Sequence, residues 1–189
     1  MTAPNRPRPF AKPRRAQGDN KPTYRRDYAA FLVDLDGTLI GRDGQISPGV
    51  AQAVGKQMIA QGKGGSIIQT ASTYGIVGPD FGIYEGSEYM GHTITTPAAY
   101  SASKGAVVAL TKYLATYWGD KGIRVNTLVP GGIESGQNET FQKNYGARTP
   151  LGRMADVDEM VGAVVYLASD ASEYVNGHNL VADGGYLTH

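Results

Sequence analysis

The stretch that decides the fold is Pro97–Lys104, with the sequence PAAYSASK, and it opens a long apolar run. Apolar residues follow at steps of three and four: Ala106, Val107, Val108, Leu110, Leu114 and Trp118. This spacing, with a proline at the start, predicts an amphipathic helix over residues 97–118. Tyr100 and Lys104 then lie one turn apart on one face. An ammonium group so close to a phenol stabilises the phenolate, so the pair could transfer a proton near neutral pH. The alternative is an ordinary helix with a half-buried tyrosine and a solvated lysine.

Apolar strands are predicted on both sides of this helix. Residues 65–72, GSIIQTAS, end in Ser72, and residues 123–129, IRVNTLV, run into Pro130-Gly131-Gly132. The full order of predicted elements is strand 28–34, helix 47–61, strand 65–71, helix 97–118, strand 123–129, helix 156–169 and strand 178–182. This alternation predicts an α/β fold, a reduced doubly wound (Rossmann-like) parallel sheet flanked by helices.

The strand ending in serine, the Tyr-x-x-x-Lys helix and the strand ending in Pro-Gly occur in an order that resembles the carboxyl-terminal half of the short-chain dehydrogenase/reductase family. The resemblance covers about residues 52–186 and includes Asn176-Gly177 and Asp183-Gly184-Gly185. It implies that Tyr100 is the acid/base, that Lys104 promotes its ionisation and holds the nicotinamide ribose, and that Ser72 hydrogen-bonds the substrate oxygen. The implied reaction is hydride transfer between a nicotinamide cofactor and a carbonyl or alcohol substrate.

The same resemblance implies a cofactor site for NAD or NADP at Tyr100, Lys104, Pro130, Gly131 and Ser135. Two parts of the family pattern are missing from the sequence: the glycine-rich dinucleotide loop and the asparagine of the proton relay. No asparagine lies between position 20 and position 126. Because contacts to adenine and pyrophosphate supply several kcal/mol, and each 1.4 kcal/mol is about tenfold in affinity, we expect weak cofactor binding and impaired activity.

An earlier segment, Asp34-Leu35-Asp36-Gly37-Thr38-Leu39, follows a short apolar strand and resembles the first motif of haloacid dehalogenase-like phosphatases. That resemblance covers about residues 29–50 and implies Asp34 as nucleophile and Asp36 as general acid/base, with magnesium. Thr70, Lys104 and Asp183 are the only candidates for the rest of such a site. The sequence thus resembles a phosphatase start joined to a truncated dehydrogenase end, with the seam near residues 46–51. Apart from this alternative, no metal site is predicted.

Two segments near the expected site show no clear periodicity. Residues 75–96 form a loop rich in glycine and aromatic residues, which separates Ser72 from Tyr100 by more than is usual in the family. Residues 136–154 resemble the family's mobile substrate lid. The next helix, 156–169, has a capping box in Asp156 and Glu159. Its apolar residues predict a buried stripe: Val157, Met160, Val161, Val164, Val165 and Leu167.

Composition divides the chain into two parts. Residues 1–27 hold eight Arg or Lys, two Asp and five of the ten prolines, which predicts a disordered basic arm. An arm without a partner is the simpler interpretation, so nucleic-acid binding is not predicted. Residues 28–189 are expected to form a single Rossmann-like domain. The chain has no cysteine and no apolar run long enough to span a membrane, which indicates a cytoplasmic protein.

The chain is expected to self-associate. Strand 28–34 is predicted to be a bare sheet edge, and such an edge invites pairing with another chain. Helices 47–61 and 97–118 resemble those through which members of the dehydrogenase family pair, and Val108, Leu110 and Trp118 are expected to add apolar surface. We therefore expect a homodimer or larger homo-oligomer. A third possibility for function is a non-catalytic folded remnant or assembly partner.

Overall fold

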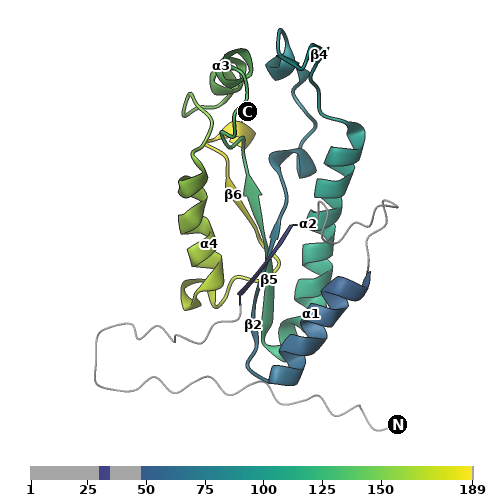
Figure 1. Ribbon diagram of the computed structural model, residues 1–189. Helices are drawn as coiled ribbons and strands as arrows, with labels where there is room; N and C mark the ends of the chain where they lie inside the picture. Colours follow the sequence, from purple (N-terminus) through teal and green to yellow (C-terminus); the bar gives the residue numbers. More distant parts are fainter. Residues whose placement is uncertain (1–29, 35–47, 189) are drawn as a thin grey trace, which may run out of the picture.

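The main sheet contains four parallel strands. The computed structural model describes residues 30–34 and 48–188 (Figure 1). The strands are β1 (Ala30–Asp34), β2 (Gly65–Thr70), β5 (Ile123–Pro130) and β6 (Asn179–Ala182), and their order is β1-β2-β5-β6. Every neighbouring pair is parallel. The carboxyl ends of the strands therefore meet at one edge of the sheet, where α/β proteins place their ligand sites.

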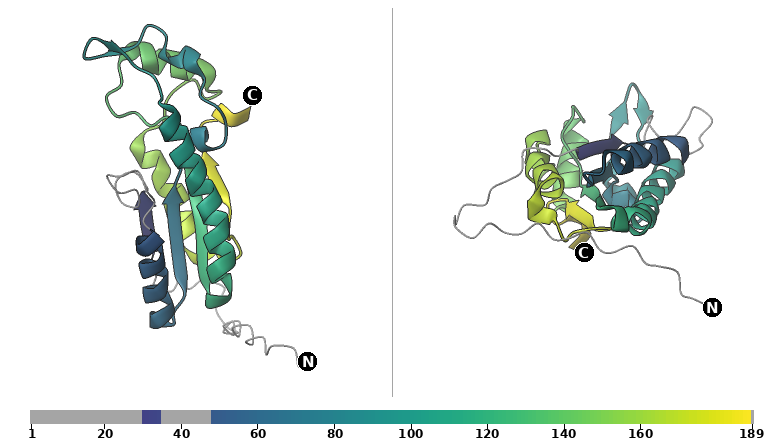
Figure 2. Two further views of the ribbon diagram at one scale, coloured as in Figure 1. Left: turned by 90° about the vertical axis from the view of Figure 1, so that its right-hand side faces the viewer. Right: turned by 90° about the horizontal axis from the view of Figure 1, so that it is seen from below.

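Helices cover both faces of this sheet. Helices α1 (Pro48–Gln61) and α2 (Ala98–Trp118) lie on one face, and α4 (Val161–Ala168) lies on the other (Figure 2). Side-chain alternation along the strands explains the layers. Ile67 packs with Val125 against α1 and α2, whereas the next residue, Ile68, packs with α4.

The expected fold class is confirmed: a Rossmann-like parallel sheet is flanked by helices. The strand predicted at 28–34 begins at residue 30 in the described part of the chain. The basic arm, residues 1–27, lies outside the described residues, and so do 35–47, which hold most of the phosphatase-like segment. Among the described residues, no helix is long and apolar enough to cross a membrane.

The segment that resembles the family's substrate lid, residues 136–154, contains a helix, α3 (Glu139–Arg148). The weak periodicity of this segment did not predict the helix, because the local signals are short. The Asn138 side chain caps the helix by accepting a hydrogen bond from the Phe141 amide at 2.9 Å. Phe141 and Tyr145, four positions apart, are buried on one face, while most other residues of the helix are polar. A 3-10 turn at Thr73–Gly75 leads into the 75–96 segment, which itself contains a second 3-10 turn (Phe81–Tyr84) and a hairpin of β3 (Glu88–Tyr89) and β4 (His92–Thr93).

The helix predicted at 156–169 differs in two respects. It begins as a 3-10 turn, Val157–Met160, with the predicted capping box of Asp156 and Glu159, and continues as α4. The buried stripe was wrong at three valines: Val157, Val161 and Val165 are 64%, 55% and 58% exposed. The sheet covers only one face of this helix, so it buries Leu167 and part of Val164 and leaves the opposite valines exposed.

A glycine lets α1 and α2 approach closely. The Trp118 indole at the end of α2 is 3% exposed and packs in a core cluster with Met58 of α1. A Cβ atom placed on Gly55 would lie 2.1 Å from Cζ2 of Trp118. The indole therefore occupies the space that any larger residue at position 55 would need.

We predict that Gly55→Ala lowers the free energy of unfolding by about 1–3 kcal/mol, because the added methyl group overlaps the indole. Urea unfolding followed by the fluorescence of Trp118, the single tryptophan, measures the change. Gly162→Ala in α4 is the control, since a Cβ atom there meets no heavy atom within 4 Å. Equal stability of the two variants would contradict the proposed contact.

Candidate active site

Three turns follow the carboxyl ends of neighbouring strands. Ser72 follows β2, Gly131 follows β5 and Asp183 follows β6. Backbone hydrogen bonds extend the ladder to this edge, from Ala71 N to Leu128 O at 2.9 Å and from Gly131 N to Ala182 O at 3.0 Å. The three turns are therefore held side by side where the carboxyl ends of the strands meet, which is where α/β proteins place their ligand sites.

The predicted serine caps a short turn. Ser72 is 9% exposed and precedes the 3-10 turn Thr73–Gly75. Its Oγ accepts a hydrogen bond from the Tyr74 backbone N–H at 3.3 Å. This contact fixes the hydroxyl oxygen close to the backbone of the turn, and the hydroxyl proton can still be donated elsewhere.

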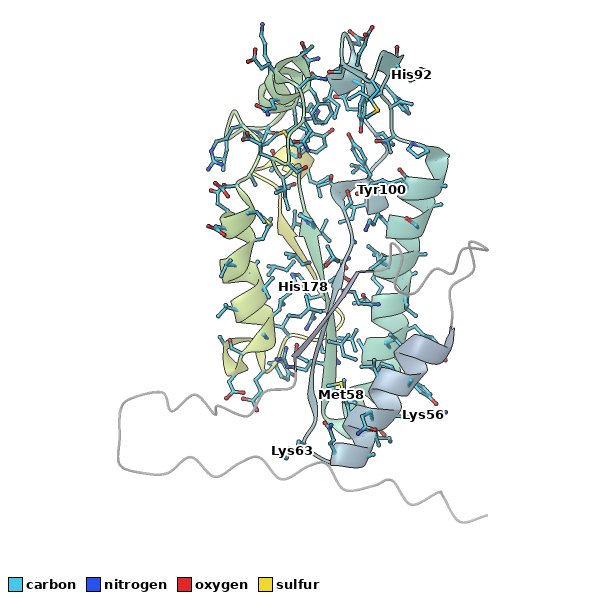
Figure 3. The ribbon with its side chains drawn as sticks, viewed as in Figure 1. Lys56, Met58, Lys63, His92, Tyr100 and His178 are labelled. Carbon is cyan, nitrogen blue, oxygen red and sulfur yellow. The ribbon has the colours of Figure 1, made fainter. Side chains whose placement is uncertain are left out.

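The predicted tyrosine and lysine share one face of α2. Lys104 is 4% exposed, and its Nζ lies 5.6 Å from the centroid of the Tyr100 ring. Lysine is seldom this buried unless its charge is paired. Tyr100 is half-buried and projects from the first turns of α2 into the region beneath the upper loops (Figure 3).

A second close backbone contact joins the serine turn to this helix. A Cβ atom on Gly75 would lie 2.6 Å from both C and O of Lys104. Only glycine permits the turn to rest on the α2 backbone at this distance. The structure therefore brings together the elements that carry Ser72, Tyr100 and Lys104.

The glycines after β5 are packed on one side by an aromatic ring. A Cβ atom on Gly132 would lie 2.7 Å from Cζ of Tyr145, and the Gly132 N–H donates to the Tyr145 hydroxyl at 2.5 Å. Burial raises the pKa of Tyr145 to about 12, so the phenol remains neutral. Ser135 is farther along and exposed, and its Oγ accepts a hydrogen bond from Gln137 Nε2 at 3.0 Å. Pro130 and Gly131 thus lie at the edge of the sheet, and Ser135 lies on an exposed turn.

An aromatic cluster covers this edge, and no sequence pattern predicted it. The cluster consists of buried residues from three separate parts of the chain: Tyr74, Ile83, Phe141, Tyr145, Met154 and Tyr186. Tyr100 packs against it. The only local signals were Tyr74, two positions after the serine, and Tyr186, directly after Asp-Gly-Gly. Their ring partners lie far away in the chain, since Tyr186 contacts both Tyr74 and Tyr145, so sequence order could not reveal the cluster.

Other candidates lie elsewhere. His178 directly precedes β6 and lies beside the middle of β5, where its amide donates to Asn126 Oδ1 at 3.0 Å. His92 lies on the hairpin at the upper end of the molecule (Figure 3). Asp34 ends β1 directly beside Thr70 of β2, whereas Asp36 lies outside the described residues. The described part of the chain contains no group of three or more His, Asp or Glu residues placed to hold a metal ion.

The parallel sheet and the site at its carboxyl edge define a Rossmann-like α/β protein. The sequence profile of a family described as enoyl-(acyl carrier protein) reductase matches residues 86–187. The chain belongs to the short-chain dehydrogenase/reductase family.

Individual relatives agree with this membership. D-threitol dehydrogenase from Mycolicibacterium smegmatis is 37% identical over 167 residues, covering 84% of this chain and 53% of that protein. A short chain dehydrogenase from Leptospira borgpetersenii, crystallised with bound NAD+, superimposes with a TM-score of 0.65 and 39% identity, covering 72% of this chain and 50% of that one. A gluconate 5-dehydrogenase from Burkholderia cenocepacia, in complex with NADP and tartrate, superimposes with a TM-score of 0.62 and 38% identity. The match covers 74% of this chain and 51% of that one. The chain spans about half the length of the curated relatives it matches.

Proposed function

We propose that the protein is an NAD(P)-dependent oxidoreductase that acts on a carbonyl or alcohol substrate. The observation that carries the proposal is the contact of Gly75 with the Lys104 backbone, which sets the Ser72 turn against the helix face of Tyr100 and Lys104. The hydrogen-bond donor Ser72, the acid/base Tyr100 and the cation Lys104 then lie close together at the carboxyl ends of the strands. The family comparisons support the same reaction class.

Each residue has a role that its chemistry permits. Ser72 donates its hydroxyl proton to the substrate oxygen and orients the carbon to be oxidised or reduced. The Tyr100 hydroxyl takes the alcohol proton in oxidation and returns it in reduction. Lys104, held with its ammonium beside the ring, stabilises the negative charge that develops on the Tyr100 oxygen.

The residues present fit the nicotinamide-ribose end of NAD or NADP. Lys104 and Tyr100 offer an ammonium and a hydroxyl to the ribose, while Pro130 and Gly131 offer backbone groups at the same edge of the sheet. When bound, the nicotinamide supplies the hydride chemistry. One of the solved relatives was crystallised with NAD+ and another with NADP, which supports either form. We also propose that this chain binds NAD or NADP weakly and that Ser135 contacts the cofactor.

The relatives also suggest a substrate class. The names of two of them specify threitol and gluconate, which are small compounds with several hydroxyl groups. We therefore propose a secondary alcohol of a small polyhydroxylated compound, or the corresponding ketone. Several hydroxyl groups suit an edge that carries serine and tyrosine hydroxyls.

We predict that Tyr100→Phe abolishes turnover of such a substrate and leaves folding nearly intact, because only the acid/base hydroxyl is removed. Lys104→Ala should weaken both turnover and cofactor binding. Steady-state rates and titration with NADH and NADPH measure the two effects. Tyr113→Phe is the control, since this tyrosine lies on α2 and is 63% exposed. A fully active Tyr100→Phe protein would contradict the assignment, and an unmodified protein that binds neither cofactor would favour a non-catalytic remnant.

A phosphatase is the second candidate, and one observation favours it. Asp34 and Thr70 are directly paired at the ends of neighbouring parallel strands, which is where an aspartate nucleophile and a hydroxyl partner would be needed. The relatives compared above are dehydrogenases and do not support it. Of the candidate functions, only the phosphatase would require magnesium.

We expect the unmodified protein to release little phosphate from a generic phosphate ester with magnesium, and we expect no difference in Asp34→Asn or in the control Asp120→Asn. Phosphate release measured with and without a chelator checks this. Strong magnesium-dependent hydrolysis that disappears only in Asp34→Asn would reverse the order of the two candidates.

Self-association is also proposed, with one correction to its basis. Trp118 is 3% exposed, so it provides no surface for a partner, whereas Val108 and Leu110 are partly buried against the core and can provide only part of theirs. Instead, Tyr113 and Tyr117 of α2 are stacked with centroids 5.9 Å apart and are 63% and 60% exposed. In the described sheet β1 is an edge strand. We propose a homodimer or larger assembly that covers α2 or the β1 edge.

Sedimentation over a wide concentration range should therefore show a dimer or a larger species. The double variant Tyr113→Ser/Tyr117→Ser should weaken an assembly that uses α2, because it removes exposed aromatic surface. Tyr174→Ser is the control, since Tyr174 is fully exposed elsewhere. A well-folded monomer at every concentration would refute self-association. A dimer unaffected by the double variant would show that the assembly does not depend on the α2 tyrosines and would favour pairing through β1.

A further inference from the structure

We propose that Tyr186 is a positioning residue that couples α3 to the turn carrying Ser72. The inference rests on the proposed role of Ser72 in binding the substrate oxygen. Tyr186 is 2% exposed and contacts aromatic residues from both of the other segments that form the aromatic cluster. It therefore links two parts of the site that are about 70 residues apart in the chain.

On one side, Tyr186 is bound to α3. Its ring stacks on Tyr145 with centroids 5.1 Å apart and an interplanar angle of 15°. The guanidinium carbon of Arg148, one helical turn farther on, lies 5.0 Å from the centroid of the same ring. Stacking and cation–π contacts of this kind are directional, so they favour one orientation of α3 relative to the ring.

On another side, Tyr186 contacts the serine turn through Tyr74. The two hydroxyl oxygens are 3.4 Å apart, and the rings meet edge to face with centroids 6.3 Å apart. Burial raises the pKa of both phenols, so both stay neutral and can share a hydrogen bond. The backbone N–H of Tyr74 in turn donates to Ser72 Oγ. A displacement of Tyr186 would therefore be transmitted to the serine hydroxyl through one intervening residue.

Tyr186 itself is anchored to the sheet. The Asp183 carboxylate, directly after β6, accepts hydrogen bonds from the amides of Gly185 and Leu187, both at 2.8 Å. Gly185 lies against Pro150, which follows α3. The tyrosine is thus fixed at the carboxyl edge and does not simply follow the helix.

The loop before α2 reinforces this coupling. Arg148 forms an ion pair with Asp80 at 3.2 Å, and the Asn144 side chain donates to the carbonyl oxygen of Glu85 at 2.9 Å. The loop, α3 and the turn of Tyr186 therefore form one packed unit above the sheet. Placing Ser72 correctly requires this unit to be assembled, because the Ser72 turn rests on α2 on one side and contacts Tyr186 on another.

Hydrogen exchange and kinetics on Tyr186→Ala and Tyr186→Phe test the proposal. Exchange reports on residues 75–77, whose amides are hydrogen-bonded within the serine turn, and on residues 139–148 of α3. Tyr186→Ala should speed exchange in both segments. Tyr186→Phe keeps the stacked ring and loses the hydroxyl, so it should speed exchange in 75–77 alone. Tyr174→Ala and Tyr174→Phe are matched controls at a fully exposed tyrosine.

Kinetics distinguish positioning from a purely structural role. In Tyr186→Ala we expect kcat to fall about tenfold to hundredfold with a smaller change in the substrate KM, because a misplaced donor slows the chemical step. Tyr186→Phe should lose less activity. Trp118 fluorescence confirms that each variant is folded.

Several outcomes would overturn the proposal. Wild-type exchange in residues 75–77 of both variants would show that Tyr186 does not control the serine turn. Unchanged kcat in a variant whose serine turn exchanges faster would show that the coupling does not affect the reaction. If the unmodified protein shows no turnover, the proposed function fails, and exchange alone decides the coupling: faster exchange in 75–77 supports it, and unchanged exchange refutes it.

Discussion

The parallel ladder between β2 and β5 is the constraint on which the other features depend. It runs from the pair Gly65 and Ile123 to the pair Thr70 and Leu128. These are the two central strands of the described sheet, most of their residues are buried, and they have α1 and α2 on one face and α4 on the other. Because the strands are parallel and in this register, the serine turn and the Pro130-Gly131 turn emerge at the same edge. A shift of one residue would exchange the two faces of a strand and place apolar side chains against the wrong layer.

Two kinds of contact then convert this edge into a site. A backbone contact between Gly75 and Lys104 holds the serine turn on α2. This contact is possible because Gly75 has no side chain. The aromatic cluster above it works in the opposite way, through large rings from three segments. Its neutral phenols can stay buried at moderate cost because each hydroxyl has a partner, whereas charged groups would not. The result is a site with one buried cation, Lys104, beside uncharged donors.

Sequence patterns located the regular elements well where a helix or strand has one buried face. The helix predicted at 97–118 is observed at Ala98–Trp118, and the strand predicted at 123–129 is observed at Ile123–Pro130. Patterns failed where periodicity is weak or absent. Helix α3 has only two strongly buried aromatic residues, and α4 is apolar on all sides, so its sequence could not show which valines face the sheet.

By itself, the sequence determined the alternation of strands and helices, and it also placed Tyr100 and Lys104 on one helical face, because both depend on spacings of a few residues. The tertiary structure alone decided that Gly75 touches Lys104 and that Tyr186 lies between Tyr145 and Tyr74. These contacts join residues about 30 to 110 positions apart, and they arise from the register of the sheet and the packing above it. Local sequence patterns extend over only a few residues, so they do not predict contacts between residues this far apart. The partners of these side chains are therefore decided by the tertiary structure.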